Sequence, residues 1–279
     1  MTHIPTAGSG AHPDGDPPRT EAAQVHLCVL ASGSRGNAVH ISDGTTSVLF
    51  DAGLSGRELE RRMESRQLRP EAIDAIVVSH EHTDHIQGVG VLARRFNAAV
   101  FVSRPTHSAA EKTLGKIERL THFSCGSPFQ VGGFRIHPFS TSHDASDPAG
   151  FTVSRNGCKI GIATDLGVVT ELVKNHLAHC NALVLEANHD PKMLEEGPYP
   201  WPLKQRIRGR SGHLSNEDSR SLLKSLIYPG LARVILAHLS EQNNTPELAL
   251  STVAEALGDS RVHLSVARQD TSTRVYRVI

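Results

Sequence analysis

The sequence predicts an α/β (α+β) protein built as a four-layer αββα sandwich. Three observations lead to this prediction. A strand-rich half is followed by a similar half with interspersed helices. The chain has 279 residues, enough to bury a sizeable core. Its apolar segments are short, so sheet strands and covering helices account for them better than membrane spans. Two sheets packed face to face beneath helices fit this order of elements.

The first half opens with short β-type runs separated by glycines, which predict an antiparallel meander. Ser55 is the expected N-cap of the helix that follows, and Glu58 completes a capping box. A nearly all-apolar strand at 75–79 is expected at the centre of a sheet. The opening runs are 25–30, 38–42 and 47–53, and a helix at 85–96, a strand at 99–102 and a helix at 105–114 complete this half.

The second half alternates strand-like runs and then repeats helix and strand. The predicted strands lie at 129–131, 134–141, 150–155, 158–164, 182–186, 232–237 and 273–278, and the helices at 168–177, 215–226 and 246–257. Residues 1–23 are rich in proline, glycine and small polar residues, so we expect a disordered tail there. Residues 24–279 form the predicted domain.

Charge and cysteine content limit the possible functions. The chain has 29 lysines and arginines and 29 aspartates and glutamates, so its formal net charge is zero. A polyanion would therefore have to bind at a local patch of basic residues. The four cysteines are scattered and are expected to be reduced core residues. No membrane span or secretion signal is recognisable, so we expect a cytoplasmic protein. The sequence makes no prediction of oligomeric state.

The most informative segment is the cluster from His80 to His85, which directly follows an apolar strand. His80 and His82 are two residues apart on extended chain, so both imidazoles point the same way and can hold one ion. Asp84 and His85 follow where a helix begins, and they turn toward a neighbouring position. One short loop therefore offers ligands to two metal ions.

This cluster resembles the signature of the metallo-β-lactamase superfamily. The resemblance implies three further ligands at later strand ends, and His143, Asp165 and His238 match them. Each stands where an apolar run meets a polar loop, so the pattern and the resemblance select the same residues. The resemblance implies that one ion is held by His80, His82 and His143, that the other is held by Asp84, His85 and His238, and that Asp165 bridges them.

This set of nitrogen and oxygen donors suits Zn²⁺, Mn²⁺ or Fe, and we expect two ions, with zinc as the first choice. Two such ions clamp a shared water and lower its pKa toward neutrality. Asp84 is therefore counted among the catalytic residues as well as the ligands.

Eight segments narrow the resemblance to the YycJ (WalJ) family over about residues 26–279. They are SGSRGN, DAGLSGRELERRM, HEHTDHIQGVGVLARRF, SHDASDPAGF, ATDLG, EANHD, GHLSN and HLSEQNN. This bacterial family contains DNA exonuclease-like enzymes, and its relatives include ribonuclease Z and the β-CASP nucleases. The interval from Asp165 to His238 is too short for a β-CASP insertion, so specificity is expected from nearby loops.

His213, in the GHLSN segment, is similar to a ribonuclease Z histidine that contacts the scissile phosphate. The similarity implies a catalytic role, with Glu186 as its carboxylate partner. The alternative is that this segment only opens a helix with Ser215 as N-cap, and both can hold, because a helix start also offers free N–H groups. His189 and Asp190 are alternative candidates for an outer ligand and its orienting partner.

A basic strip precedes His213 and consists of Lys204, Arg206, Arg208 and Arg210. A charge run is often only a solvated helix face, but a phosphodiester substrate of a neutral protein requires such a strip. We therefore predict a metal-dependent phosphodiesterase, a nuclease that acts on DNA ends. The alternatives are hydrolysis of a small ester, thioester or lactone on the same fold, and a binding module with a degenerate site. The binding module is disfavoured because every expected metal-ligand position is occupied by a suitable residue.

Overall fold

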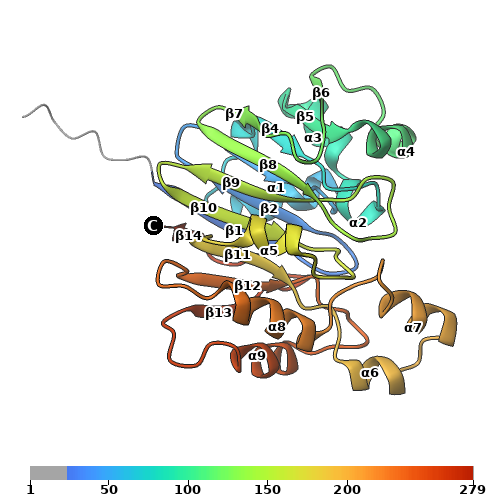
Figure 1. Ribbon diagram of the computed structural model, residues 1–279. Coiled ribbons are helices and arrows are strands. Elements are labelled where there is room, and N and C mark those ends of the chain that lie inside the picture. Colours follow the sequence, from blue (N-terminus) through green and yellow to red (C-terminus); the bar gives the residue numbers. More distant parts are fainter. Residues whose placement is uncertain (1–23, 279) are drawn as a thin grey trace, which may run out of the picture.

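A computed structural model describes residues 24–278, and within them the chain forms two seven-stranded sheets packed face to face (Figure 1). Helices cover the outer side of each sheet. The four-layer αββα sandwich expected from the sequence is confirmed. The predicted tail, residues 1–23, lies outside the described residues.

The first sheet has the strand order β14-β1-β2-β3-β4-β5-β6. Its opening strands pair antiparallel, as the glycine-separated runs predict, whereas β3 to β6 are parallel and require helical crossovers. The strands are β1 (Val25–Ala31), β2 (Ala38–Ser42), β3 (Ser47–Phe50), β4 (Ala75–Val77), β5 (Ala99–Ser103), β6 (Leu120–Phe123) and β14 (Tyr276–Val278). The helices are α1 (Gly56–Glu64), the 3₁₀ turn η1 (Pro70–Ala72), α2 (Thr83–Ile86), α3 (Val89–Phe96) and α4 (Arg104–Leu114).

The second sheet has the order β13-β12-β11-β10-β9-β8-β7. It is also antiparallel first and parallel afterwards, with the change at β10. The strands are β7 (Phe129–Val131), β8 (Phe134–Ser140), β9 (Ala149–Arg155), β10 (Cys158–Ala163), β11 (Ala182–Glu186), β12 (Arg233–Ala237) and β13 (His263–Val266). The helices are α5 (Glu171–Leu177), α6 (Pro191–Glu196), α7 (Trp201–Ile207), α8 (Asn216–Leu226) and α9 (Pro246–Ala254).

Three apolar clusters separate the four layers. The central cluster lies between the sheets and includes Phe50, Phe134 and Phe151, all of them buried. A second cluster packs the helices α1, α3 and α4 on the first sheet, and a third packs α5, α8 and α9 on the second. Both sheets are thereby fixed relative to each other, and the strand ends that meet at one edge are held in place.

Two local predictions need correction. The expected helix at 85–96 is broken into α2 and α3, because the Gly88 N–H donates to the Ala52 carbonyl at 2.7 Å and the Asp84 carbonyl accepts from the Asn37 N–H instead. The capping box at Ser55 is only half formed. Ser55 accepts a hydrogen bond from the Glu58 backbone N–H, but the Glu58 carboxylate binds Arg61 and Arg62 instead.

The cysteines agree with the sequence prediction. All four are free, with Cys28, Cys158 and Cys180 buried and Cys125 partly buried. Burial raises the pKa of the Cys180 thiol to about 12, which keeps it protonated and unreactive. Within residues 24–278 no helix is both long and apolar enough to cross a bilayer.

Candidate metal centre

The candidate site lies where strand ends of both sheets meet, at the edge that carries α2 and α7 (Figure 1). Three of its residues, Asp51, Asp165 and His238, adopt left-handed backbone conformations with φ near +57°. Such angles are uncommon for residues other than glycine and are found where surrounding structure enforces them, often at functional sites. Each of the three directly follows or closely follows a buried strand, so the sheet determines where its side chain points.

The first group of donors contains His80, His82 and His143. His82 Nδ1 lies 3.1 Å from His80 Nε2 and 3.3 Å from His143 Nε2. Burial, helped by the neighbouring His85 and His143, lowers the pKa of His80 well below its usual value. Neutral imidazoles with nitrogens this close are suited to share a cation.

The second group contains Asp84, His85 and His238. Asp84 Oδ2 lies 3.5 Å from Nε2 of each histidine. Burial opposes a charge on His238, but Asp165, Asp84 and Glu186 outweigh it and raise its pKa to about 10. A positive charge is therefore favoured at this position, whether it is carried by a proton or by a metal ion.

Asp165 lies between the two groups and is 3% exposed. Its Oδ2 is 3.3 Å from His85 Nε2, and its Oδ1 is 3.4 Å from His238 Nδ1 and 3.8 Å from His143 Nε2. The buried Oδ2 and the buried His238 Nε2 have no hydrogen-bond partner among the described residues. An unpartnered buried polar atom is costly, and a cation would satisfy both atoms, so the donor set fits a metal centre.

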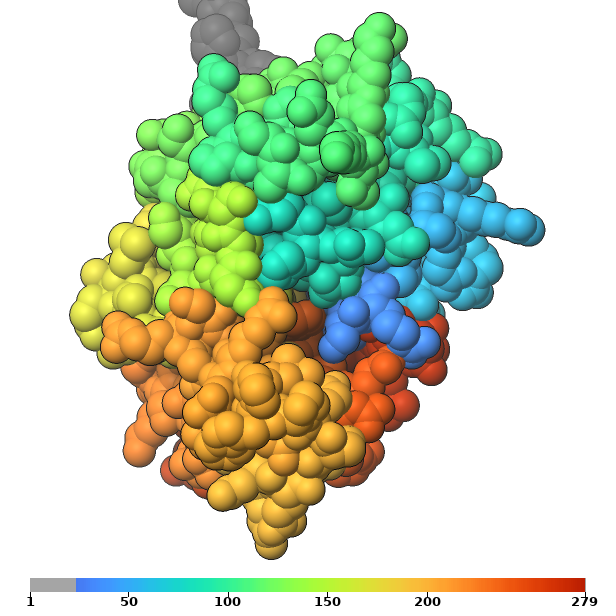
Figure 2. Space-filling model, turned by 90° about the vertical axis from the view of Figure 1, so that its right-hand side faces the viewer, coloured from blue at the N-terminus to red at the C-terminus, as the bar shows by residue number. Residues whose placement is uncertain are grey.

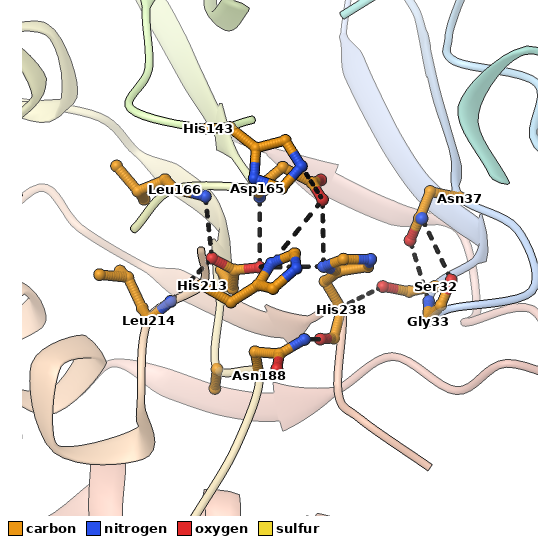
Figure 3. Close-up of polar contacts among 12 residues, drawn as sticks. Ser32, Gly33, Asn37, His143, Asp165, Leu166, Asn188, His213, Leu214 and His238 are labelled. Carbon is orange, nitrogen blue, oxygen red and sulfur yellow. Dashed lines mark hydrogen bonds and ion pairs between the residues drawn. The ribbon is translucent and has the colours of Figure 1, made fainter. Parts of the chain in front are cut away.

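Glu186 is fully buried behind this cluster. Its Oε1 accepts hydrogen bonds from His213 Nδ1 at 2.8 Å and His238 Nδ1 at 2.9 Å. Its carboxylate also accepts the backbone N–H groups of Leu166 and Leu214, which Figure 3 shows directed toward one point. Burial opposes its charge, but His213 and these hydrogen bonds lower its pKa to about 2. Glu186 therefore positions two histidines and two loops without reaching the cleft.

The hydrogen bonds of Glu186 fix how the two histidines face the site. Because Nδ1 of each ring is held by the carboxylate, Nε2 is the nitrogen that remains for a metal or a substrate. His213, at 19% side-chain exposure, lies beside His143 and His238 with ring centroids 4.9 and 5.1 Å away. Ser215 is the N-cap of α8, which confirms the helix-start interpretation of the GHLSN segment, and the catalytic role of His213 stays a prediction.

Three supporting residues were missed from the sequence. Asp51 Oδ2 lies 2.8 Å from His85 Nδ1, and Ser79 donates to Asp51 through both its backbone N–H and its hydroxyl. Asn37 donates to Asp84 Oδ2 at 3.2 Å and its backbone N–H holds the Asp84 carbonyl. Asp51 carries the same signal as the predicted ligands, a carboxylate directly after an apolar strand.

A cleft of about 240 Å³ opens over the donors, and Figure 2 shows the hollow above the light-orange α6–α7 segment. Tyr199, Leu203 and Arg206 form one wall, opposite His82 and Asp84. The sequence analysis did not predict α6 or α7, so it missed this wall.

The four cations of the basic strip have different surroundings, and their predicted contact with phosphate stays a prediction. Arg206 alone among its four cations lines the cleft, where it forms an ion pair with Asp144. Lys204 donates to the Glu195 carbonyl at 2.6 Å, and the Arg208 guanidinium lies 4.6 Å from the centre of the Trp201 ring. Arg210 is exposed and does not line the cleft.

His189 and Asp190, the alternative outer ligand and orienting partner, have other surroundings. Asp190 is the N-cap of α6, where its carboxylate accepts the Met193 N–H at 2.9 Å. His189 is 3% exposed, and burial lowers its pKa to about 4. It belongs to none of the metal-compatible groups among residues 24–278.

Two mixed sheets with a histidine and aspartate cluster at their common edge define a class of metal-dependent hydrolases. The chain belongs to the β-lactamase superfamily domain family, whose model matches residues 46–239. It is 38% identical to the exodeoxyribonuclease YycJ of Bacillus anthracis over 84% of this chain and 89% of that protein. It is 36% identical to the exodeoxyribonuclease WalJ of Streptococcus pneumoniae serotype 2 over 85% and 90%.

Solved structures agree on the fold. The metallo-β-lactamase fold protein YhfI from Bacillus subtilis superposes with a TM-score of 0.70 at 16% identity, over 90% of this chain and 99% of that one. The short form of human tRNase Z superposes with a TM-score of 0.63 at 16% identity, over 90% and 99%. At this identity the similarity concerns the fold alone.

Proposed function

We propose that this protein is a metal-dependent phosphodiesterase that acts as an exonuclease on DNA. The observation that carries the proposal is His213, which lines an open cleft beside metal-compatible donors and is held from behind by the buried Glu186. The names of the two curated relatives, both exodeoxyribonucleases, support the same reaction class and substrate.

Two divalent ions are proposed to bind, zinc being the first candidate because five imidazoles dominate the donor set. His80, His82 and His143 would hold one ion, and Asp84, His85 and His238 the other, with Asp165 shared. Bound ions would supply Lewis acidity and a water of lowered pKa.

His213 is proposed as the general acid. Its Nδ1 is fixed by Glu186 at 2.8 Å, so Nε2 carries the proton that passes to the leaving oxygen as the P–O bond breaks. The carboxylate of Glu186 stabilises the imidazolium before transfer, and it stays charged because its pKa is about 2. Glu186 is therefore a positioning residue, and His213 is the catalytic one.

Arg206 is proposed as the phosphate contact. Asp144 lies in the same cleft, next to His143, and its negative charge would repel a phosphodiester unless Arg206 neutralised it. The Arg206 side chain is 61% exposed, so its remaining N–H groups are free to reach a substrate oxygen. We expect a smaller contribution to DNA binding from the other three cations of the strip, Lys204, Arg208 and Arg210.

The cleft role of Arg206 is tested by comparing Arg206→Gln with Arg210→Gln, which removes an equal charge from outside the cleft. We expect Arg206→Gln to weaken binding of a single-stranded oligonucleotide and to flatten the slope of log K against log[salt] by about 0.7. Arg210→Gln should change both much less. Equal effects of the two variants would argue that the whole strip binds DNA electrostatically.

The substrate class is tested with metal-loaded protein and four substrates: single-stranded DNA, duplex DNA, RNA and a thioester dye. We expect release of nucleotides from DNA ends and loss of that activity after chelation. Fast thioester hydrolysis without DNA binding at low salt would replace this proposal with the small-ester alternative. We further propose a reducing, cytoplasmic location, since all four cysteines are free.

A further inference from the structure

A second polar groove, of about 460 Å³, lies on the outer face of the second sheet, beside α5. None of its lining residues also lines the metal cleft. In Figure 1 the outer faces of β8 and β9 are turned toward the viewer, and α5 packs on the end of β8 through His176 and Phe139. The lining residues are Arg135, His137, Thr152, Ser154, Lys159, Leu172, Asn175 and His176.

Strand register places cations on both sides of a hydroxyl. Ser154 of β9 is the direct partner of Arg135 on β8 and of Lys159 on β10. Because neighbouring strands lie about 4.8 Å apart, the two cationic residues are roughly 10 Å apart at their backbones, with the serine between them. In the next row, Thr152 pairs with His137. The outer face of the sheet therefore carries hydrogen-bond donors around the Ser154 and Thr152 hydroxyls.

The groove has no counter-charge of its own. None of its lining side chains is a carboxylate. Elsewhere on residues 24–278 many arginines are paired, such as Arg35 with Glu241, Arg155 with Asp43 and Arg220 with Glu255. Arg135 makes no ion pair within the same range.

Lys159 and His176 complete the lining of the groove on the α5 side. The Lys159 ammonium donates to the Ala178 carbonyl at 2.7 Å, which leaves two of its three N–H groups for a ligand. His176 stacks on Phe139 with centroids 4.7 Å apart and meets His137 edge-on at 4.6 Å. Burial, together with the nearby His137 and Lys159, lowers the pKa of His176, as expected beside uncompensated positive charge.

We propose that this groove is a second anion site, distinct from the metal centre, which binds a phosphate group between Arg135 and Lys159. Guanidinium, ammonium and hydroxyl donors around one point are the groups that recognise phosphate oxygens. The phosphate could be free or part of a nucleic-acid strand that extends beyond the cleft. The site does not depend on the proposed nuclease reaction, because it is built from a separate set of residues.

The test is a residue-resolved NMR titration of the zinc-loaded full chain with inorganic phosphate and, separately, with a short single-stranded DNA. We expect saturable shifts at the backbone amides of Arg135, Ser154, Lys159 and His176. Shifts with phosphate alone identify a free-phosphate site, and shifts with the oligonucleotide only identify a strand site; both support the proposal. Shifts confined to the cleft, or equal shifts with chloride at the same ionic strength, would overturn it.

The variants supply the control. The double variant Arg135→Gln/Lys159→Gln should weaken binding about tenfold, the sum expected for two partly exposed charge contacts. Lys224→Gln/Arg261→Gln removes the same charge from exposed positions outside the groove and should bind as the wild type does. Because Lys159 also holds the end of α5, Arg135→Gln alone separates ligand binding from folding. Unchanged affinity in both groove variants would also overturn the proposal.

Discussion

The two halves of the chain contribute to the metal centre in different ways. The first sheet provides four donors from one loop, His80 to His85, whereas the second provides single donors at three separate strand ends. The supporting contacts differ as well. In the first half Asp51 contacts the ligand His85 and Asn37 contacts Asp84 and His85. In the second half Glu186 holds one ligand, His213 and two backbone segments. The first half therefore supplies its donors from one short loop, and the second half gathers its donors from separate strand ends, with Glu186 joining several of these segments.

The largest expected effect comes from Asp165, where the contributions of the two halves meet. Asp165→Asn removes the charge between the two donor groups with little change in volume, so we expect loss of metal and an activity loss beyond the ~10²–10⁴-fold of a missing general acid. Metal content by mass spectrometry and turnover of a phosphodiester dye measure both. A variant with two ions and wild-type turnover would refute the bridging assignment.

The next effect separates the two histidines that share Glu186. His238→Ala should lower metal content, because its Nε2 is a proposed ligand. His213→Ala should retain the metal and reduce kcat by ~10²–10⁴. Metal content and kcat are measured for both variants in parallel. Equal loss of metal in the two variants would contradict the assignment of different roles to His238 and His213.

A smaller effect compares the supporting carboxylates of the two halves. Asp51→Asn should weaken metal affinity by ~10–100-fold through His85 while leaving the fold intact. Glu186→Gln should also lower the melting temperature, since an amide cannot accept all the hydrogen bonds that the carboxylate accepts. Calorimetry of the metal-free variants measures the difference. Equal melting temperatures of the two variants would contradict the claim that Glu186 supports the fold more than Asp51 does.

The last effect concerns stability instead of metal binding or activity, and it lies in the first sheet away from the site. Burial lowers the pKa of His40 from 6.5 to about 4. The unfolded chain therefore binds the extra proton, so the contribution to stability is complete above pH 6.5 and is lost as the pH falls through 4. His40→Gln should flatten this dependence by up to ~3 kcal/mol between pH 6.5 and 4. Urea unfolding across that range checks it, and identical slopes for variant and wild type would contradict it.

The same contrast explains what the sequence could predict. The His80–His85 loop is visible because its spacing and its preceding apolar strand are local. Asp51 carried the same signal, but its partner His85 is 34 positions away, so only the fold reveals the pair. The short helices α6 and α7 lie in a proline-rich stretch with little periodicity, and β6 and β13 are short strands at sheet edges. These elements depend on tertiary packing, which is why the cleft wall and the pairing of Arg206 with Asp144 were not predicted.

The most direct test of the central claim is anomalous X-ray diffraction at the zinc edge from crystals of the metal-loaded protein. We predict two peaks, one among His80, His82 and His143 and the other among Asp84, His85 and His238, with Asp165 between them. A single peak among the histidines of one half, or a peak bound by His213 and Glu186 instead, would contradict a centre assembled jointly by both halves of the chain.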